Sequence, residues 1–311
     1  MTEFHHVSVL LDECIDALNI KPDGIYVDGT LGGAGHSSEI VKRLTTGRLI
    51  GIDRDNKALA AAGERLAPYA DRVTLVHSNF SDMDRVLADL GIEGVDGILL
   101  DLGVSSPQLD EAERGFSYMA DAPLDMRMND EDSLTAHEVV NTWPREELRR
   151  ILYEYGEERY APQIAAAIER RRAEKPIETT LELVDVIRSA MPPAALREKQ
   201  HPAKRSFQAI RIAVNDELGA VGRVMEEAVP LLNRGGRLAI ITFHSLEDRI
   251  VKNGMASAAK GCTCPPEFPV CVCGKKPKVK LISRKPIVSG DEELERNPRA
   301  RSAKLRVCET L

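Results

Sequence analysis

The 311-residue sequence contains no apolar run that approaches the roughly 18 consecutive residues needed to cross a membrane. Its first residues, Met1–His6, include no basic segment that leads into an apolar one, so we expect no secretory signal. Internal repeats and low-complexity tracts are also missing. These absences exclude membrane-spanning and repeat architectures, and they favour a soluble, cytoplasmic globular protein.

The sequence also lacks the cysteine pattern of a disulfide-stabilised protein. Cys14 and Cys308 are isolated, and the other four cysteines lie within twelve residues, in two C-x-C pairs: Cys262, Cys264, Cys271 and Cys273. In a chain without a secretory signal, four thiolates this close can bind one zinc ion tetrahedrally. The usual spacing is C-x2-C, so redox-labile or unliganded thiols are the alternative. We interpret the cluster as a structural zinc site that pins a proline-rich loop.

The formal net charge of −7 argues against indiscriminate binding of nucleic acids, but the charge is unevenly distributed. Between Lys275 and Arg306, eleven basic residues stand against four acidic ones, so this segment carries +7 and the rest of the chain −14. We interpret the segment as a surface for a phosphate backbone, with Arg299, Arg301 and Lys304 as candidate RNA-binding residues. A solvated surface with chance clustering is the alternative.

Short apolar strands alternate with amphipathic helices in the first third of the chain. We predict four strands, over residues 25–28, 48–53, 73–77 and 95–101, and two helices, over residues 37–44 and 56–66. Such alternation is typical of βαβ units and of a parallel sheet with helices on both faces. The sequence therefore predicts an α/β fold.

The pattern changes after the fourth strand. Residues 107–205 are rich in charge and in helix formers, and we predict helices over 146–155, 161–173 and 180–190. One long helix over 209–232, a fifth strand over 237–243 and a last strand over 302–308 resume the first pattern. We therefore expect a discontinuous core, 1–106 and 206–311, that contains the cysteine-rich loop at 262–273. The block 107–205 is expected to be an inserted helical substrate-recognition domain.

A glycine-rich segment follows the first strand. Asp28–His36 reads G-x-x-G-G-x-G after its aspartate, which does not fit the G-x-G-x-x-G dinucleotide motif and could be a structural turn alone. Asp53 ends the second strand, where it could accept hydrogen bonds from ribose hydroxyls or cap the next helix. Phe80 follows the third strand, where it could pack on an adenine ring, and Asp101 ends the fourth. Ligands of parallel sheets bind at these strand ends, so the four features together predict a nucleoside site for a methyl donor.

These segments resemble the bacterial 16S ribosomal RNA cytosine-N4 methyltransferases, the RsmH/MraW family. The resemblance covers nearly the whole chain and lies in residues 9–13, 28–37, 101–110, 113–117, 123–128, 155–159, 207–212, 243–249 and 297–302. It implies a Rossmann-like core, dependent on S-adenosylmethionine, that is interrupted by a helical domain. It also implies methyl transfer to the N4 amine of a cytosine in the decoding region of 16S rRNA, within the small ribosomal subunit.

The resemblance also implies where the cofactor binds. The cofactor-binding residues fall here on Gly33, Ala34, Gly35, His36, Asp53, Phe80, Asp101 and Gln108. The family often has glycine at the position of Ala34, and we expect the extra methyl group to be tolerated if the backbone φ there is negative.

The transfer itself is an in-line displacement that mainly requires alignment of the amine with the methyl group. We expect the Asp101 carboxylate, or the backbone and hydroxyls around Ser105, to accept hydrogen bonds from the amine; a cofactor contact alone is the alternative for Asp101. His244 follows the fifth strand, where it could line a pocket for the extruded base or serve only in packing. His5 and His6 are more simply surface residues. The competing functions are an amine methyltransferase for DNA or protein, and an RNA-binding assembly factor with a vestigial cofactor site.

Overall fold

The chain folds into two compact units in a computed structural model that describes residues 8–262, 264, 265, 268–270 and 272–311. Unit 1 comprises Met1–Gly103 and Leu218–Leu311, and unit 2 comprises Val104–Glu217. Unit 2 thus begins close to the predicted start of the inserted block, at residue 107. It ends twelve residues beyond the predicted end at residue 205, which falls inside a helix, α10 (Lys204–Asn215).

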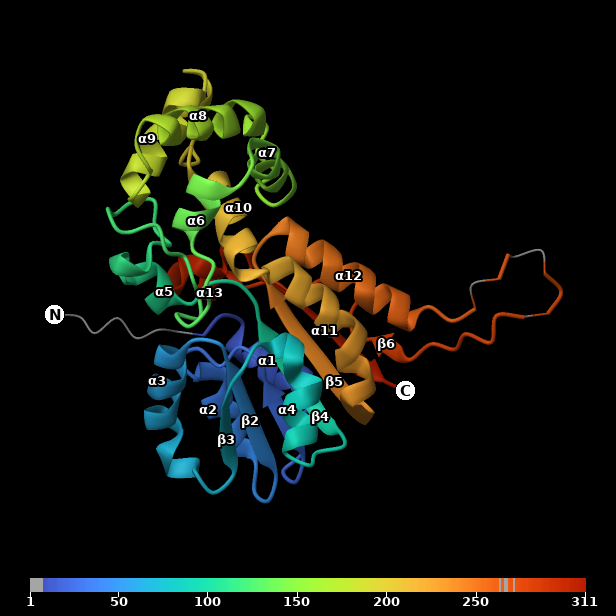
Figure 1. Ribbon diagram of the computed structural model, residues 1–311. Helices are drawn as coiled ribbons and strands as arrows, with labels where there is room; N and C mark the ends of the chain where they lie inside the picture. The colour runs from blue at the N-terminus through green and yellow to red at the C-terminus, as the bar shows by residue number, and fades with distance from the viewer. Residues whose placement is uncertain (1–7, 263, 266–267, 271) are drawn as a thin grey trace. The chain divides into compact units, whose positions relative to one another are not determined.

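Unit 1 is built on a seven-stranded sheet with the strand order β3-β2-β1-β4-β5-β7-β6 (Figure 1). Strands β1 to β5 run parallel, whereas β7 is antiparallel to both β5 and β6. The first four strands have the predicted bounds: β1 (Ile25–Asp28), β2 (Arg48–Asp53), β3 (Val73–His77) and β4 (Val95–Asp101). The predicted α/β fold with a Rossmann-like parallel sheet is therefore confirmed.

Helices cover both faces of this sheet. They are α1 (Leu11–Leu18), α2 (Gly35–Arg43), α3 (Asn56–Leu66), α4 (Met83–Asp89), α11 (Glu217–Leu231), α12 (Ser245–Ala259) and α13 (Asp291–Arg296). Successive residues of one strand enter different cores: Leu99 packs in the core with α1 and α2, and Leu100 packs in the core with α4 and α11. This two-sided burial explains why the strands are continuous apolar runs.

The predicted long helix over 209–232 is wrong. The structure has two helices there, α10 and α11, separated by Asp216, whose φ is +48°. The Asn215 side chain ends α10 by bonding across unit 2: it accepts from the amide of Met128 and donates to the carbonyl of Met126. Apolar periodicity continues through this point, so the break depends on contacts far apart in the sequence.

Two further predictions need correction at the other edge of the sheet. Strand β5 (Leu232–Thr242) begins five residues earlier than predicted. Gly235 was expected in a turn before the strand, but it lies inside the strand, where the pairing with β4 is irregular between Leu232 and Arg237. The last strand, β7 (Lys304–Thr310), begins two residues later than predicted, after a 3-10 turn over Pro298–Ser302. Its neighbour β6 (Val279–Leu281) was not predicted, because a three-residue strand carries too little alternation to be recognised.

Unit 2 is helical. Its helices are α5 (Ser106–Asp110), α6 (Ala136–Thr142), α7 (Arg145–Glu154), α8 (Ala161–Glu174), α9 (Thr180–Ala190) and α10. They enclose one core of buried apolar side chains, and the predicted helices over 146–155, 161–173 and 180–190 are confirmed to within one residue. Arg172 donates to the carbonyls of Val140 and Trp143 at the end of α6, so this basic residue of the insertion has a structural role. Across the described part of the chain, helices are too short or too polar for a membrane span.

Candidate active site

The loop between β1 and α2 is tied to the strands on both sides of β1. The amide of Gly32 donates to Oδ2 of Asp53 at the end of β2 (2.8 Å), and the amide of Asp101 at the end of β4 donates to Oγ1 of Thr30 (2.5 Å). The amide of Leu31 also donates to the carbonyl of Ile52. The glycine-rich segment is therefore held rigidly against two strand ends that both carry an acid.

Ala34 occupies a backbone conformation that favours glycine. Its φ is +56°, so the condition for tolerating its methyl group, a negative φ, is not met. The left-handed conformation costs an L-residue about 1–2 kcal/mol, which gives a physical reason for glycine at this position. Ala34 is fully buried, and its amide donates to the carbonyl of Leu31 (2.7 Å), so the surrounding structure holds the conformation. By contrast, a Cβ added at Gly33 would meet no atom within 4 Å, which shows open space beside the loop.

Asp53 is poised to accept further hydrogen bonds. Its Oδ1 accepts from the amide of Asp55 (2.9 Å) and its Oδ2 from the amide of Gly32, so each oxygen retains accepting capacity. Burial raises its pKa to about 6. The alternative role as a helix cap is wrong, because it is Asp55 that caps α3, by accepting from the amide of Lys57.

Asp28 and Asp101 are the other two acids at the strand ends. Asp28 is almost fully buried and accepts from the hydroxyl of Ser37 (2.7 Å) and from the amide of Thr30 (3.2 Å). Oδ1 of Asp101 is buried and has no hydrogen-bond partner among the residues that the structure describes. Burial raises the pKa of both carboxyls to about 6. The partnerless oxygen of Asp101 fits a ligand that brings an N–H donor or a positive charge.

His36 lies between the N-terminal segment and Asp101. Its Nε2 is 3.0 Å from the carbonyl of Val9, and because a carbonyl only accepts, this nitrogen carries the proton. Nδ1 faces Oδ2 of Asp101 at 3.9 Å. Phe80 is partly buried beside the loop, since a Cβ added at Gly29 would lie 3.0 Å from its Cβ. The structure thus gathers Gly33, Ala34, Gly35, His36, Asp53, Phe80 and Asp101 around the carboxyl ends of the parallel strands.

His244 is fixed at the start of α12 by a buried acid that sequence reasoning missed. Glu247 is 1% exposed; its Oε2 accepts from the amides of Phe243 and His244, and its Oε1 lies 3.1 Å from Nε2 of His244. Nδ1 of His244 is buried and partnerless within the described residues. Glu247 forms a capping box with His244, but the sequence signal of that motif has Ser or Thr at the N-cap, so the histidine concealed it.

Ser105 and Gln108 belong to unit 2. They form a capping box on α5, in which Oε1 of Gln108 accepts from the amide of Ser105 (3.0 Å) and Oγ of Ser105 accepts from the amide of Gln108 (3.4 Å). This pairing fixes both side chains locally. The predicted catalytic role of Ser105 and cofactor-binding role of Gln108 stay predictions.

The basic residues of the C-terminal segment, which include the predicted RNA-binding residues, differ in their surroundings. Lys304 and Arg306 on β7 both form ion pairs with Asp248 of α12, at 3.3 and 2.6 Å. Arg299 and Arg301 are exposed on the 3-10 turn that precedes β7. Part of the basic C-terminal segment is therefore engaged in fixing α12 to the sheet.

Three of the four predicted zinc ligands, Cys262, Cys264 and Cys273, lie together in the structure. The fourth, Cys271, lies outside the described residues, as do His5 and His6.

Comparisons with known proteins establish the family of this chain. The profile of the MraW methylase family matches residues 3–311. The chain belongs to the MraW methylase family. Three relatives carry the name ribosomal RNA small subunit methyltransferase H. The protein of Heliobacterium modesticaldum is 59% identical over 310 residues and that of Brevibacillus brevis 60% over 309, with 99% of this chain covered and 99% and 98% of theirs. That of Clostridioides difficile is 57% identical over 310 residues, 99% of this chain and 100% of its own.

The raised pKa values of the three acids at the strand ends predict an unusual pH dependence of the stability of this MraW methylase. The pKa of Asp28 is about 6 in the folded chain and about 3.8 when unfolded, so the folded state binds more protons between pH 4 and 6 and loses stability as pH rises. Asp28→Asn replaces the carboxyl group with an amide that does not titrate, so this contribution to the pH dependence disappears. We expect the free energy of unfolding of the variant, relative to the wild type, to increase from pH 4 to pH 7 by at most about 3 kcal/mol, measured by denaturant titration.

Asp248→Asn is the matched control with the opposite sign. Hydrogen bonds and charge from Arg306 hold the pKa of Asp248 below its usual value. The wild type therefore gains stability as the pH rises from the lowered pKa of the folded state to the usual pKa of the unfolded state. The relative stability of this variant is expected to fall with pH. A pH-independent difference for Asp28→Asn would contradict the assignment of a raised pKa.

Proposed function

We propose that this MraW methylase transfers a methyl group from S-adenosylmethionine to the N4 amine of a cytosine in the decoding region of 16S rRNA, within the small ribosomal subunit. The observation that carries the proposal is the match, at 57–60% identity over nearly the full length, to proteins named ribosomal RNA small subunit methyltransferase H. The motifs that resemble the cytosine-N4 methyltransferases support the choice of base.

The residues at the strand ends fit the donor. S-adenosylmethionine would supply a methyl group on a positively charged sulfur, which is a good leaving group. Asp53 has the accepting capacity for two ribose hydroxyls, and the space beside Gly33 lets a ligand approach the backbone. Phe80 offers an apolar face next to this loop. The partnerless oxygen of Asp101 supplies negative charge within the same group of strand ends.

We propose that the Asp101 carboxylate accepts a hydrogen bond from the cytosine amine. The lone pair of the cytosine amine is delocalised into the ring, so the amine is a poor nucleophile. An acceptor for its N–H localises the lone pair and stabilises the positive charge that develops as the N–C bond forms and the S–C bond breaks. The electron pair of the broken S–C bond would stay on the sulfur, which becomes a neutral thioether, and the surplus proton would pass from the nitrogen to water. The base must be extruded from its stack to reach this site, and we propose that His244 and Ser105 contact it there.

The RNA-binding surface follows from charge. Arg299 and Arg301 are exposed in a basic segment, and Lys304 is 42% exposed although it pairs with Asp248. We propose that these residues contact phosphates, and that the helical unit 2 contributes to substrate recognition. A protein with net charge −7 and one basic segment suits a shaped, assembled particle better than naked RNA. Such a substrate places the enzyme in the cytoplasm.

The direct test is the modification state of ribosomal RNA. In a strain that lacks the gene, we expect mass spectrometry of 16S rRNA fragments to show loss of one N4-methyl group on a decoding-region cytosine, restored by the wild-type gene. Unchanged cytosine methylation would reject the proposal in favour of another amine substrate. Restoration by a variant that does not bind the donor would point to an assembly factor.

Gly33→Ala tests the donor site without disturbing the fold. Its new Cβ meets no protein atom within 4 Å but enters the space beside the loop, so we expect an unchanged melting temperature and an affinity for S-adenosylmethionine lowered about tenfold or more, measured by calorimetry. Gly91→Ala is the converse control. Gly91 has a φ of +66° and precedes the amino end of β4, whereas the candidate site lies at the carboxyl ends of the strands. This variant should lose about 1 kcal/mol of stability and keep its affinity. Equal affinities of both variants would refute the placement.

Asp101→Asn separates catalysis from cofactor contact. If Asp101 accepts from the amine, kcat falls about 100-fold at saturating donor while the dissociation constant of S-adenosylmethionine changes much less. Because its pKa is about 6, wild-type kcat is expected to rise between pH 5 and pH 7, and the variant should lose this dependence. A raised dissociation constant with an unchanged kcat would leave Asp101 a donor contact only.

A further inference from the structure

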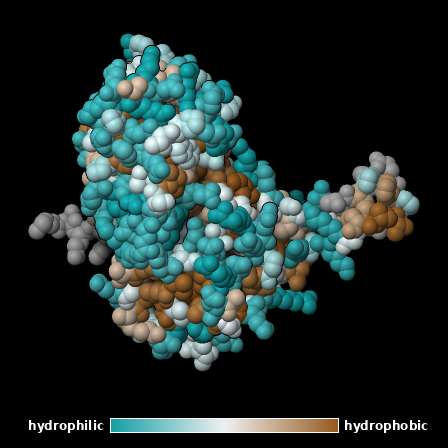
Figure 2. All heavy atoms as spheres, viewed as in Figure 1, coloured by the Kyte–Doolittle hydropathy of each residue, from teal (hydrophilic) through white to brown (hydrophobic). Residues whose placement is uncertain are grey.

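The segment between α12 and β6 carries no core. None of its described residues between Gly261 and Lys278 is buried, and Phe268, Val270 and Val272 expose 49–74% of their surface. Figure 2 shows the resulting hydrophobic tip on the segment that Figure 1 draws running out from α12. Its ends are joined, because the amide of Lys278 donates to the carbonyl of Ala258 (2.9 Å). Burial of apolar surface therefore does not explain the conformation of this segment.

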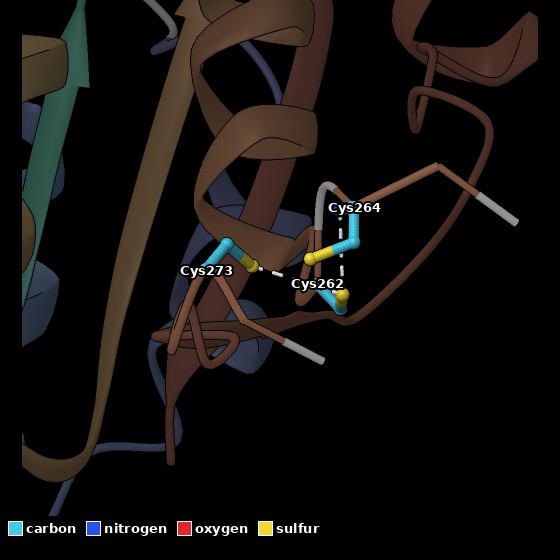
Figure 3. Close-up of side chains that lie close together, drawn as sticks. All are labelled: Cys262, Cys264 and Cys273. Carbon is cyan, nitrogen blue, oxygen red and sulfur yellow. Dashed lines mark hydrogen bonds between the residues drawn. The ribbon is translucent and has the colours of Figure 1, made fainter. Parts of the chain in front are cut away.

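Three cysteine sulfurs nevertheless converge in it. The Sγ atoms of Cys262, Cys264 and Cys273 lie within 4.8 Å of one another, and those of Cys262 and Cys273 are 3.7 Å apart. Figure 3 shows the three side chains turned toward a common space. A disulfide requires about 2.05 Å between sulfurs, which excludes a bond between Cys262 and Cys273. Two thiolates on a tetrahedral zinc ion, each about 2.3 Å from the metal, lie about 3.8 Å apart, which matches the observed separation.

Backbone amides are directed at these sulfurs. The amide of Cys264 donates to Sγ of Cys262, and the amide of Val272 donates to Sγ of Cys264, both at 3.4 Å. Donors of this kind stabilise the negative charge of thiolates and orient them around a metal. Lys275 and Lys276 follow the last cysteine and offset part of that charge. Cysteine without a ligand is usually buried, whereas Cys262 and Cys273 are exposed, so the cluster lacks the burial that is typical of unliganded thiols.

We propose that Cys262, Cys264 and Cys273 supply three of the four ligands of one structural zinc ion, which takes the place of a hydrophobic core in the segment between α12 and β6. Three thiolates select a soft, tetrahedral metal and disfavour magnesium or calcium, which prefer oxygen ligands. The site has no part in methyl transfer. Its occupation can therefore be tested independently of the proposed function.

The first experiment measures metal content. We expect about one zinc ion per chain in full-length protein that is produced with zinc in the medium and purified without chelators, measured by inductively coupled plasma mass spectrometry. Cys264→Ser should lower this content at least about fivefold, whereas Val272→Ser, at an exposed neighbour whose amide contact is retained, should leave it unchanged. Both variants should melt at the wild-type temperature, because no described residue of the segment is buried. Zinc-free wild type, bound iron, or equal zinc loss in Val272→Ser would overturn the proposal.

The second experiment follows ligation and order. Cobalt exchanged for zinc should give thiolate-to-metal charge-transfer absorption, which Cys264→Ser weakens. Removal of zinc by a chelator should speed tryptic cleavage after Lys275 by about tenfold, because the segment loses its only proposed restraint. Cobalt spectra without charge-transfer bands, or cleavage indifferent to the chelator, would contradict a thiolate site.

Discussion

Hydrogen bonds from the loop after β1 to both neighbouring strands determine the geometry of the candidate active site. They depend on the strand order, because β1 lies between β2 and β4 and its loop can therefore reach Asp53 on one side and Asp101 on the other. The acids are held in place before any ligand binds, so binding does not have to order them. Burial disfavours the charged form of each carboxyl and raises its pKa to about 6. A ligand with hydrogen-bond donors and positive charge would stabilise the charged form and lower these pKa values again.

The parallel half of the sheet could be predicted from the sequence because its information is local. Strands β1 to β4 are apolar runs that end at polar residues, and Asp53 and Asp101 follow from those ends. The break at Asp216 could not be predicted, since it depends on Asn215 bonding to a segment almost ninety residues away. The conformation of Ala34 was equally hidden, because alanine gives no sign of a positive φ. Glu247 could not be recognised either, because its N-cap partner is His244 rather than the Ser or Thr of the capping-box pattern.

The basic C-terminal segment shows what a count of charged residues cannot predict, namely which of the charges form ion pairs within the protein. A count of residues predicted a basic surface, but the structure divides its members between two roles. Arg306 is bonded to Asp248, and Lys280 is bonded to Glu309, so these charges fix α12 and the strand pair β6–β7. Arg299 and Arg301 remain exposed. The proposed phosphate contacts therefore lie on the 3-10 turn before β7 and at Lys304, the first residue of the strand, rather than further along β7.

The two proposed ligand sites use different sources of order within unit 1. At the strand ends, a packed sheet positions carboxylates whose charge the protein leaves for a ligand to balance. In the segment after α12, no described residue between Gly261 and Lys278 is buried, and three cysteine sulfurs lie together instead of a hydrophobic core. A metal ion orders such a segment through a few strong bonds at one point, which leaves every other side chain on the surface. Such bonds would allow Phe268, Val270 and Val272 to be exposed while Cys262, Cys264 and Cys273 stay together.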